Sequence, residues 1–205
     1  TISLMGGADV FQMQDNGSFE LALHRTFPDM QLKVRNLGWP ADTVYRQQRP
    51  MYFYTEKGDT QKGSIPDIRE KVTVGTFVLR FGKMESLDGL DTLDDFAAAY
   101  AGLVDELSEL TERIILVQPL SFEASGPAGT LAGARNKTLE AYRSRIASLA
   151  SGRGLMVVDS FAELTAPSGQ PGESRRFAVL KKNHLWDQYY RPTNWAFLFG
   201  DRQHV

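Results

Sequence analysis

Short apolar runs alternate with longer helical patterns along the whole chain. Runs rich in Val, Leu and Ile predict strands over residues 1–5, 31–37, 72–81, 113–117 and 155–158. Apolar residues at helical spacing predict helices over residues 11–27, 91–110 and 131–150. Strands that alternate with helices are typical of a parallel sheet covered on both faces. The pattern therefore predicts an α/β fold with a parallel sheet of about five strands.

The same pattern predicts where ligands bind. In an open α/β sheet, ligands bind outside the carboxyl ends of the strands. This rule selects the loops at 6–9, 36–42, 82–86, 118–123 and 159–160. A longer segment over 45–65, rich in Gln, Arg, Lys and Gly, is either a functional lid or a plain surface excursion.

Composition narrows the classes of function. At 205 residues and 42% hydrophobic, the chain has enough apolar material for one core, so residues 1–205 are predicted to form a single domain. A net charge of -2 argues against a nucleic-acid partner, and no apolar run is long enough to span a membrane. Without cysteine, thiol catalysis and disulfides are excluded. The three histidines are scattered, so we expect no metal site and no cofactor.

Both ends of the sequence carry an expectation about its context. Thr1 already lies inside an apolar run, which predicts that the chain is a processed or excised piece of something longer. Residues 171–205 combine six Lys or Arg with seven aromatic residues. Aromatic rings beside Arg can stack on sugars or bases, or they can simply cover a core. We expect this C-terminal tail to pack back on the domain.

Three motifs in the predicted loops and the tail carry a family resemblance. Residues 35–44 read Arg-Asn-Leu-Gly-Trp-Pro-Ala-Asp-Thr-Val, and residues 82–86 read Gly-Lys-Met-Glu-Ser. The tail holds Lys-Asn-His-Leu-Trp at 182–186 and Arg-Pro-Thr-Asn at 191–194. These runs resemble the motifs of SGNH/GDSL hydrolases. They are most similar to the SGNH-like domains of planctomycete and verrucomicrobial multidomain proteins, which often lie beside haem-c modules.

The resemblance implies a flavodoxin-like three-layer sandwich, hydrolysis of ester bonds, and a bacterial periplasmic or secreted location within a larger polypeptide. Such enzymes usually place a nucleophilic Ser after the first strand and an Asp-x-x-His pair near the C-terminus. A Gly after the second strand and an Asn after the third donate hydrogen bonds to the oxyanion. Here Gly38 matches the first of these donors, and Asn36 and Trp39 beside it become candidates for ligand binding.

The chain departs from the family pattern at three places. The position that matches the nucleophile holds Ala8, and a methyl group cannot attack a carbonyl carbon. Met84 replaces the oxyanion Asn, and its thioether cannot donate a hydrogen bond. Between residues 161 and 177, where the Asp-x-x-His pair is expected, none occurs, and this spacing is found only at the end of the sequence, in Asp201-Arg202-Gln203-His204. Together these departures predict degenerate catalytic blocks and little or no ordinary esterase activity.

Four residues stay candidates for chemistry: Asp9, Glu85, Ser86 and His184. Glu85 either activates a water, with Asp9 as its partner, or binds a backbone amide. Ser86 is a candidate replacement nucleophile, although no His has an obvious relation to it in the sequence, and His184 is either a site residue or part of the aromatic tail. Two further hypotheses therefore stand beside the inactive hydrolase. One is a non-catalytic domain that binds a carbohydrate, a small polar ligand or a partner module, and the other is a hydrolase with a carboxylate-activated water.

Overall fold

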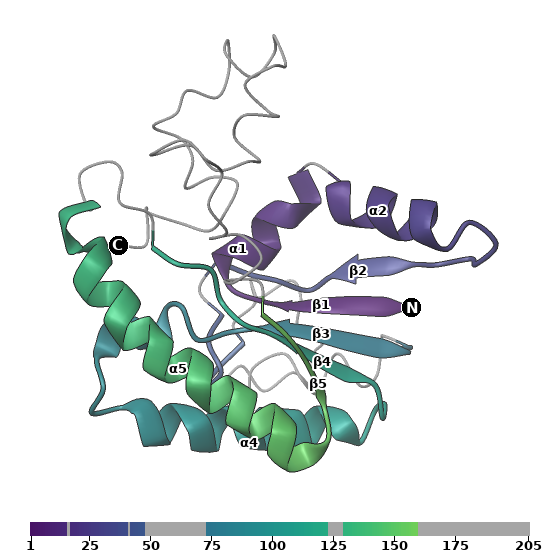
Figure 1. Ribbon diagram of the computed structural model, residues 1–205. Coiled ribbons are helices and arrows are strands. Elements are labelled where there is room, and N and C mark those ends of the chain that lie inside the picture. Colours follow the sequence, from purple (N-terminus) through teal and green to yellow (C-terminus); the bar gives the residue numbers. More distant parts are fainter. Residues whose placement is uncertain (16, 41, 48–72, 123–128, 160–205) are drawn as a thin grey trace, which may run out of the picture.

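The computed structural model describes residues 1–15, 17–40, 42–47, 73–122 and 129–159. In these ranges all strands are parallel and belong to one sheet of order β2-β1-β3-β4-β5 (Figure 1). The strands are β1 (Ile2–Gly6), β2 (Val34–Asn36), β3 (Thr76–Arg80), β4 (Ile114–Val117) and β5 (Met156–Val158). The predicted five-stranded parallel sheet is confirmed, although β2 and β3 are shorter than the apolar runs that predicted them.

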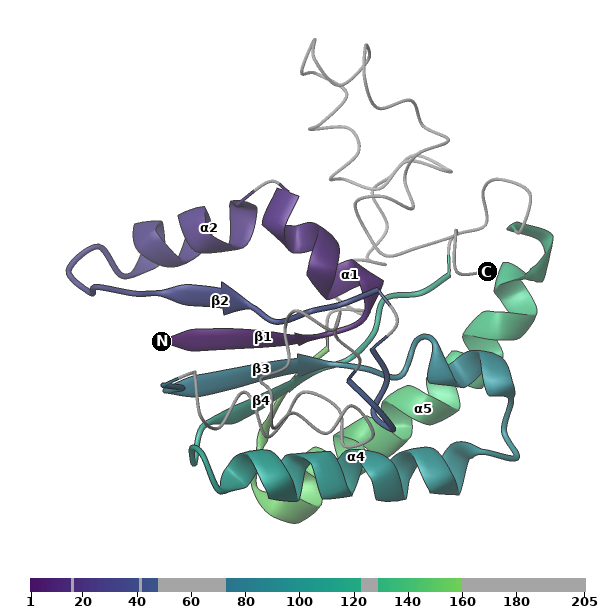
Figure 2. The same cartoon turned by 180° about the vertical axis from the view of Figure 1, so that it is seen from behind.

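Helices lie on both faces of the sheet (Figures 1 and 2). They are α1 (Ala8–Phe11), α2 (Ser18–Thr26), α4 (Leu93–Ser108) and α5 (Ala132–Arg153). Because crossovers between parallel strands are right-handed, the strand order places α1 and α2 on one face and α4 and α5 on the other. The three layers of the predicted sandwich are thus present. Among the described residues, no helix combines the length and the hydropathy that crossing a membrane requires.

The prediction of one continuous helix over 11–27 is wrong. The chain forms α1, a 3-10 turn at Gln12–Asp15 and then α2. The interruption lies at Gly17, which caps α2 with a φ of 58°. This left-handed conformation is open to glycine and breaks a regular helix. Of the other predicted segments, most of 45–65 and the whole tail over 171–205, with His184, lie outside the described residues.

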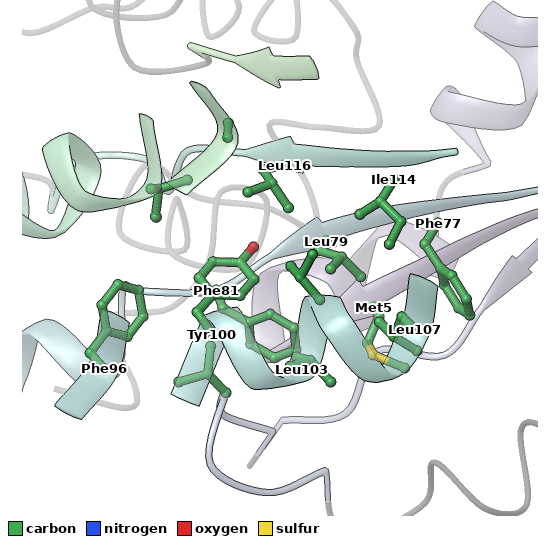
Figure 3. Close-up of a cluster of buried hydrophobic side chains, with 14 of the residues drawn as sticks. Met5, Phe77, Leu79, Phe81, Phe96, Tyr100, Leu103, Leu107, Ile114 and Leu116 are labelled. Atoms are coloured by element: carbon green, nitrogen blue, oxygen red, sulfur yellow. The ribbon is translucent and has the colours of Figure 1, made fainter. Parts of the chain in front are cut away.

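The core lies between the sheet and α4 and α5 (Figure 3). Side chains alternate across a strand, so Phe77 and Leu79 of β3 point toward the same face. There they pack with other fully or nearly buried side chains from β1, β4 and α4, namely Met5, Ile114, Leu116, Phe96, Tyr100, Leu103 and Leu107. This packing fixes the strands relative to one another and so aligns their carboxyl ends along one edge.

A close contact on the opposite face brings α1 against the turn after β2. A Cβ added at Gly38 would lie 2.7 Å from the backbone nitrogen of Phe11 and 2.8 Å from Cγ1 of Val10. Real Cβ atoms do not approach other atoms so closely, so only glycine fits here without a shift of the backbone. The loops after β1 and β2 therefore lie directly side by side.

Candidate functional site

A pocket opens at the carboxyl edge of the sheet, where four of the five predicted loops meet. Its lining is made of Gly7, Ala8, Asp9, Asp42, Arg80, Phe81, Gly82, Lys83, Met84, Glu85, Pro119 and Phe122. Arg80 is the last residue of β3, and the other residues follow β1, β2, β3 and β4, as the rule for open α/β sheets predicts. Among the described residues, no group of three or more His, Asp or Glu side chains is arranged to hold a metal ion.

Ala8 is the first residue of α1, and its buried side chain lines the pocket. The preceding Gly7 caps the helix without a side-chain hydrogen bond. Met84 lies in the same lining, on the turn after β3. The two positions that the sequence resemblance matches to the nucleophile and to an oxyanion donor therefore lie in one pocket, to which Ala8 and Met84 contribute a methyl group and a thioether.

Arg80 and Asp9 form a largely buried ion pair in the pocket lining. Arg80 Nε lies 2.8 Å from Asp9 Oδ2, and the two side chains are only 14% and 10% exposed. The Nε–H does not meet hydrogen-bond geometry toward this oxygen, and Nη2 is buried without a partner. The contact is therefore electrostatic. The other carboxylate oxygen, Oδ1, accepts the Val10 N–H at 2.9 Å.

Asp9, the predicted partner of Glu85, lines the same pocket as Glu85, where Arg80 engages it. Asp9 forms its ion pair with Arg80. The negative charge of Asp9 also raises the pKa of Glu85, but burial of Glu85 raises it more. Sequence reasoning missed Arg80 altogether. The one sequence feature that could have indicated it is a basic residue at the end of the strand Thr76–Arg80, at the edge of the sheet where ligands bind.

Glu85 joins the turns after β2 and β3 from a position that is 3% exposed. Its Oε1 accepts the Val44 N–H and its Oε2 accepts the Gly82 N–H, both at 2.8 Å. Burial raises the pKa of Glu85, these two backbone hydrogen bonds lower it, and burial prevails. The prediction that the Glu85 carboxylate accepts a hydrogen bond from the backbone is confirmed.

Because the pKa of Glu85 is raised in the folded protein, the free energy of unfolding should depend on pH in a predictable direction. Above its ordinary value of 4.5, the folded protein keeps a proton that the unfolded chain has released. The free energy of unfolding of the wild type should therefore fall, relative to Glu85→Gln, as the pH rises from 4.5 through the folded pKa. Urea unfolding of both proteins from pH 4.5 to 8 measures this difference. A difference that grows with pH would contradict the assignment.

The Ser86 hydroxyl is used within its own turn. Oγ donates to the Lys83 carbonyl oxygen at 2.7 Å, and the residue is 3% exposed. The structure places no described histidine beside it, and His184 lies outside the described residues. The hydroxyl therefore has the geometry of a group that stabilises its own loop.

The three predicted ligand-binding residues after β2 hold the turn against α1. The Gly38 N–H donates to Asn36 Oδ1 at 2.9 Å, while Asn36 Nδ2 donates to the Val10 carbonyl oxygen at 2.6 Å. The Trp39 N–H donates to the Gly6 carbonyl oxygen at 3.0 Å, and its ring meets Phe11 edge-on at 5.6 Å. The amide expected to stabilise an oxyanion is thus bonded to a side chain of its own turn.

A cationic and aromatic cluster on the far side of the pocket was not predicted. Lys83 Nζ lies 5.1 Å from the ring centroid of Phe122, and Arg135 Cζ lies 5.8 Å from it. Asn136 of α5 anchors the backbone of Phe122, because its side chain accepts the Phe122 N–H at 2.7 Å and donates to the Phe122 carbonyl oxygen at 3.0 Å. The sequence separation of these residues explains why no local motif indicated the cluster.

Comparison with known proteins identifies the fold. No protein-family profile matches the sequence, and no curated protein matches it. Among solved structures, a serine-to-alanine catalytic mutant of an acetylxylan esterase from Geobacillus stearothermophilus is similar, with a TM-score of 0.55 and 17% identity over 78% of this chain and 76% of that chain.

Two further structures agree with this. A lipase/acylhydrolase from Enterococcus faecalis has a TM-score of 0.56 and 20% identity over 82% of this chain and 80% of that chain. An α/β hydrolase from the metagenome of Lake Arreo, Spain, has a TM-score of 0.56 and 13% identity over 78% and 77% of the respective chains. The protein therefore has an α/β fold of the SGNH-hydrolase type.

Proposed function

We propose that this SGNH-hydrolase-like domain does not carry out ordinary ester hydrolysis and that its pocket binds a carbohydrate or another small polar ligand. The observation that carries the proposal is Ala8, whose methyl group lines the pocket at the position that matches the nucleophile. Without a hydroxyl there, the pocket offers no group that forms an acyl-enzyme by the family's route.

The oxyanion site supports the same proposal. Met84 contributes no donor, and the Gly38 N–H is bonded to Asn36. The loss of one such donor costs about 3 to 4 kcal/mol of transition-state stabilisation in other enzymes. A similar solved structure is that of a catalytic mutant of an acetylxylan esterase in which a serine is replaced by alanine.

The lining suits a ligand with several hydroxyl groups. Phe122 offers an apolar ring flanked by Lys83 and Arg135, and Asp42 contributes a buried carboxylate. Sugars combine an apolar face with hydroxyls that donate and accept hydrogen bonds, so a ring beside charged polar groups is a typical carbohydrate site. On the motif resemblance alone, we also propose that the domain belongs to a larger bacterial polypeptide that is periplasmic or secreted.

An activity assay tests the proposal directly. Wild type and Ala8→Ser are incubated with short-chain aryl esters and with a fluorophosphonate that labels activated serines. We expect neither turnover nor labelling in either protein, because a restored hydroxyl still lacks the oxyanion donors and a described base. We expect a panel of mono- and oligosaccharides to raise the melting temperature of the wild type. Stoichiometric labelling of a serine in the wild type would refute the proposal.

A hydrolase with a carboxylate-activated water is the second candidate. It is favoured by one observation, a buried Glu85 with a raised pKa in the pocket lining. Both oxygens of this carboxylate already accept backbone amides, which leaves it poorly placed to take a proton from water. Ester hydrolysis without serine labelling, abolished by Glu85→Gln in a folded protein, would establish this candidate instead.

A further inference from the structure

Two cations contact one aromatic ring at the pocket. Lys83 Nζ lies 5.1 Å and Arg135 Cζ lies 5.8 Å from the ring centroid of Phe122, and both Lys83 and Phe122 line the pocket. Phe122 is 7% exposed, whereas Lys83 and Arg135 are each partly exposed, so a ligand reaches the two cations more readily than the ring. We call these three residues (Lys83, Phe122, Arg135) the Phe122 cluster.

The backbone that carries the Phe122 cluster is held in place on every side. In both views α5 begins beside the edge toward which the strands point, and Arg135 lies in its first turn (Figures 1 and 2). The next residue, Asn136, binds both backbone polar groups of Phe122. The carbonyl oxygen of Lys83 accepts the Ser86 hydroxyl within the turn after β3. A site whose backbone is ordered in advance loses less conformational entropy when a ligand binds.

The carboxylates in the pocket lining are engaged or buried. Asp9 uses one oxygen for the ion pair with Arg80 and the other for a backbone N–H. Both oxygens of Glu85 accept backbone N–H groups, and Asp42 is only 1% exposed. The ion pair of Asp9 and Arg80 is electrically neutral as a unit. Among the described residues of the lining, the charge that a ligand meets is therefore positive and belongs to the Phe122 cluster.

This arrangement favours an anionic group on the ligand. Two like charges within 5.8 Å of one ring centroid repel each other, and an anion that lies beside both relieves the repulsion. The guanidinium of Arg135 presents a planar fork of N–H groups that matches a carboxylate or a sulfate, and the ammonium of Lys83 adds a compact charge. The chain as a whole has a net charge of -2, so this positive charge is local to the pocket.

We infer that the pocket selects an acidic carbohydrate, a sugar that carries a carboxylate or a sulfate ester, over the neutral sugar of the same shape. The anionic group of the sugar binds beside Lys83 and Arg135, and its hydroxyls face the rest of the lining. This inference rests on the proposed function, because it names the class of carbohydrate that the same pocket takes. Salt screens charges that are partly exposed, so the preference for the acidic sugar should weaken as the NaCl concentration rises.

Calorimetric titration of the full chain with matched sugars tests the inference. Glucose, galactose and mannose are each compared with their uronic acids, and glucose is also compared with glucose 6-sulfate, all at low salt. We expect the acidic sugars to bind at least about tenfold more tightly than their neutral parents, which is the scale of a hydrogen bond to a charged group.

Variants of α5 assign the preference to the Phe122 cluster. Arg135→Gln should reduce it to less than about threefold, because the charge-assisted hydrogen bonds are lost. Arg135→Lys keeps the charge and should retain more of the preference than Arg135→Gln. Lys137→Gln is the matched control, since it removes the same charge from an exposed position two residues further along the helix and should leave the preference unchanged.

The outcomes separate this inference from the proposed function. Equal affinity for the acidic sugars and their neutral parents would overturn the inference and leave the proposed function standing. Affinity for none of the sugars would contradict carbohydrate binding and the inference with it. Equal loss of preference in Arg135→Gln and Lys137→Gln, or full displacement of glucuronic acid by the same concentration of acetate, would also overturn the inference. A preference that is lost in Arg135→Gln, kept in Lys137→Gln and weakened by NaCl supports it.

Discussion

Replacing Arg80 with methionine will lower the free energy of unfolding by about 3 kcal/mol, because it leaves the Asp9 carboxylate buried without its cation. The Asp9 side chain is only 10% exposed, and its Oδ2 lies 2.8 Å from Arg80 Nε. Breaking a buried pair by removing one partner typically costs about 3 to 5 kcal/mol. We expect the lower end of this range, since Arg80 Nη2 already lacks a hydrogen-bond partner and methionine relieves that deficit.

Urea unfolding at constant pH measures the change, and a surface pair provides the matched control. Arg145 contacts Asp94, but these side chains are 46% and 85% exposed, so Arg145→Met should cost less than about 1 kcal/mol. The double variant Asp9→Asn with Arg80→Met should recover at least about 1 kcal/mol relative to Arg80→Met alone, because the uncompensated charge is gone. If Arg80→Met and Arg145→Met have equal effects, the buried pair does not stabilise the pocket.

The same pair illustrates which part of the site local sequence reveals. Alternating hydrophobicity predicted the strands, and the rule that ligands bind at the carboxyl ends of parallel strands selected the loops, so Ala8, Asp9 and Glu85 were correctly brought to one pocket. Charge pairing depends on which side chains face each other across neighbouring strands. Arg80 of β3 lies opposite Gly6 of β1, and Gly6 is two residues before the start of α1, which carries Asp9. Arg80 and Asp9 are far apart in the sequence, so no local motif indicates that they are neighbours.

Backbone hydrogen bonding set a second limit on prediction. The motif around Gly38 correctly indicated a turn at the ligand-binding edge, but the partner of its N–H depends on the rotamer of Asn36 and on the position of α1. Likewise, apolar spacing over 11–27 favoured one helix, although Gly17 takes a left-handed conformation and divides it. Patterns average over many residues, whereas these features depend on single dihedral angles.

Replacing Glu85 with alanine will lower the free energy of unfolding by about 4 kcal/mol. The carboxylate accepts the N–H groups of Val44 and Gly82, each at 2.8 Å, and the residue is 3% exposed. Alanine leaves both donors buried without an acceptor, and each such donor costs about 1 to 3 kcal/mol. Gly82 has a φ of 108°, and a Cβ there would lie 3.2 Å from Ile146, so its turn has little freedom to find another acceptor.

A graded series separates this acceptor role from simple loss of a side chain. Glu85→Gln keeps one acceptor oxygen, and its amide NH2 faces the second N–H, so we expect about half the loss that alanine causes. Asp88→Ala, on the same 3-10 turn but exposed, should change stability by less than about 0.5 kcal/mol. Hydrogen exchange of the Val44 and Gly82 amides should accelerate in Glu85→Ala and stay unchanged in Asp88→Ala. Since these two amides belong to the turns after β2 and β3, equal exchange in both variants would mean that Glu85 does not hold the pocket together.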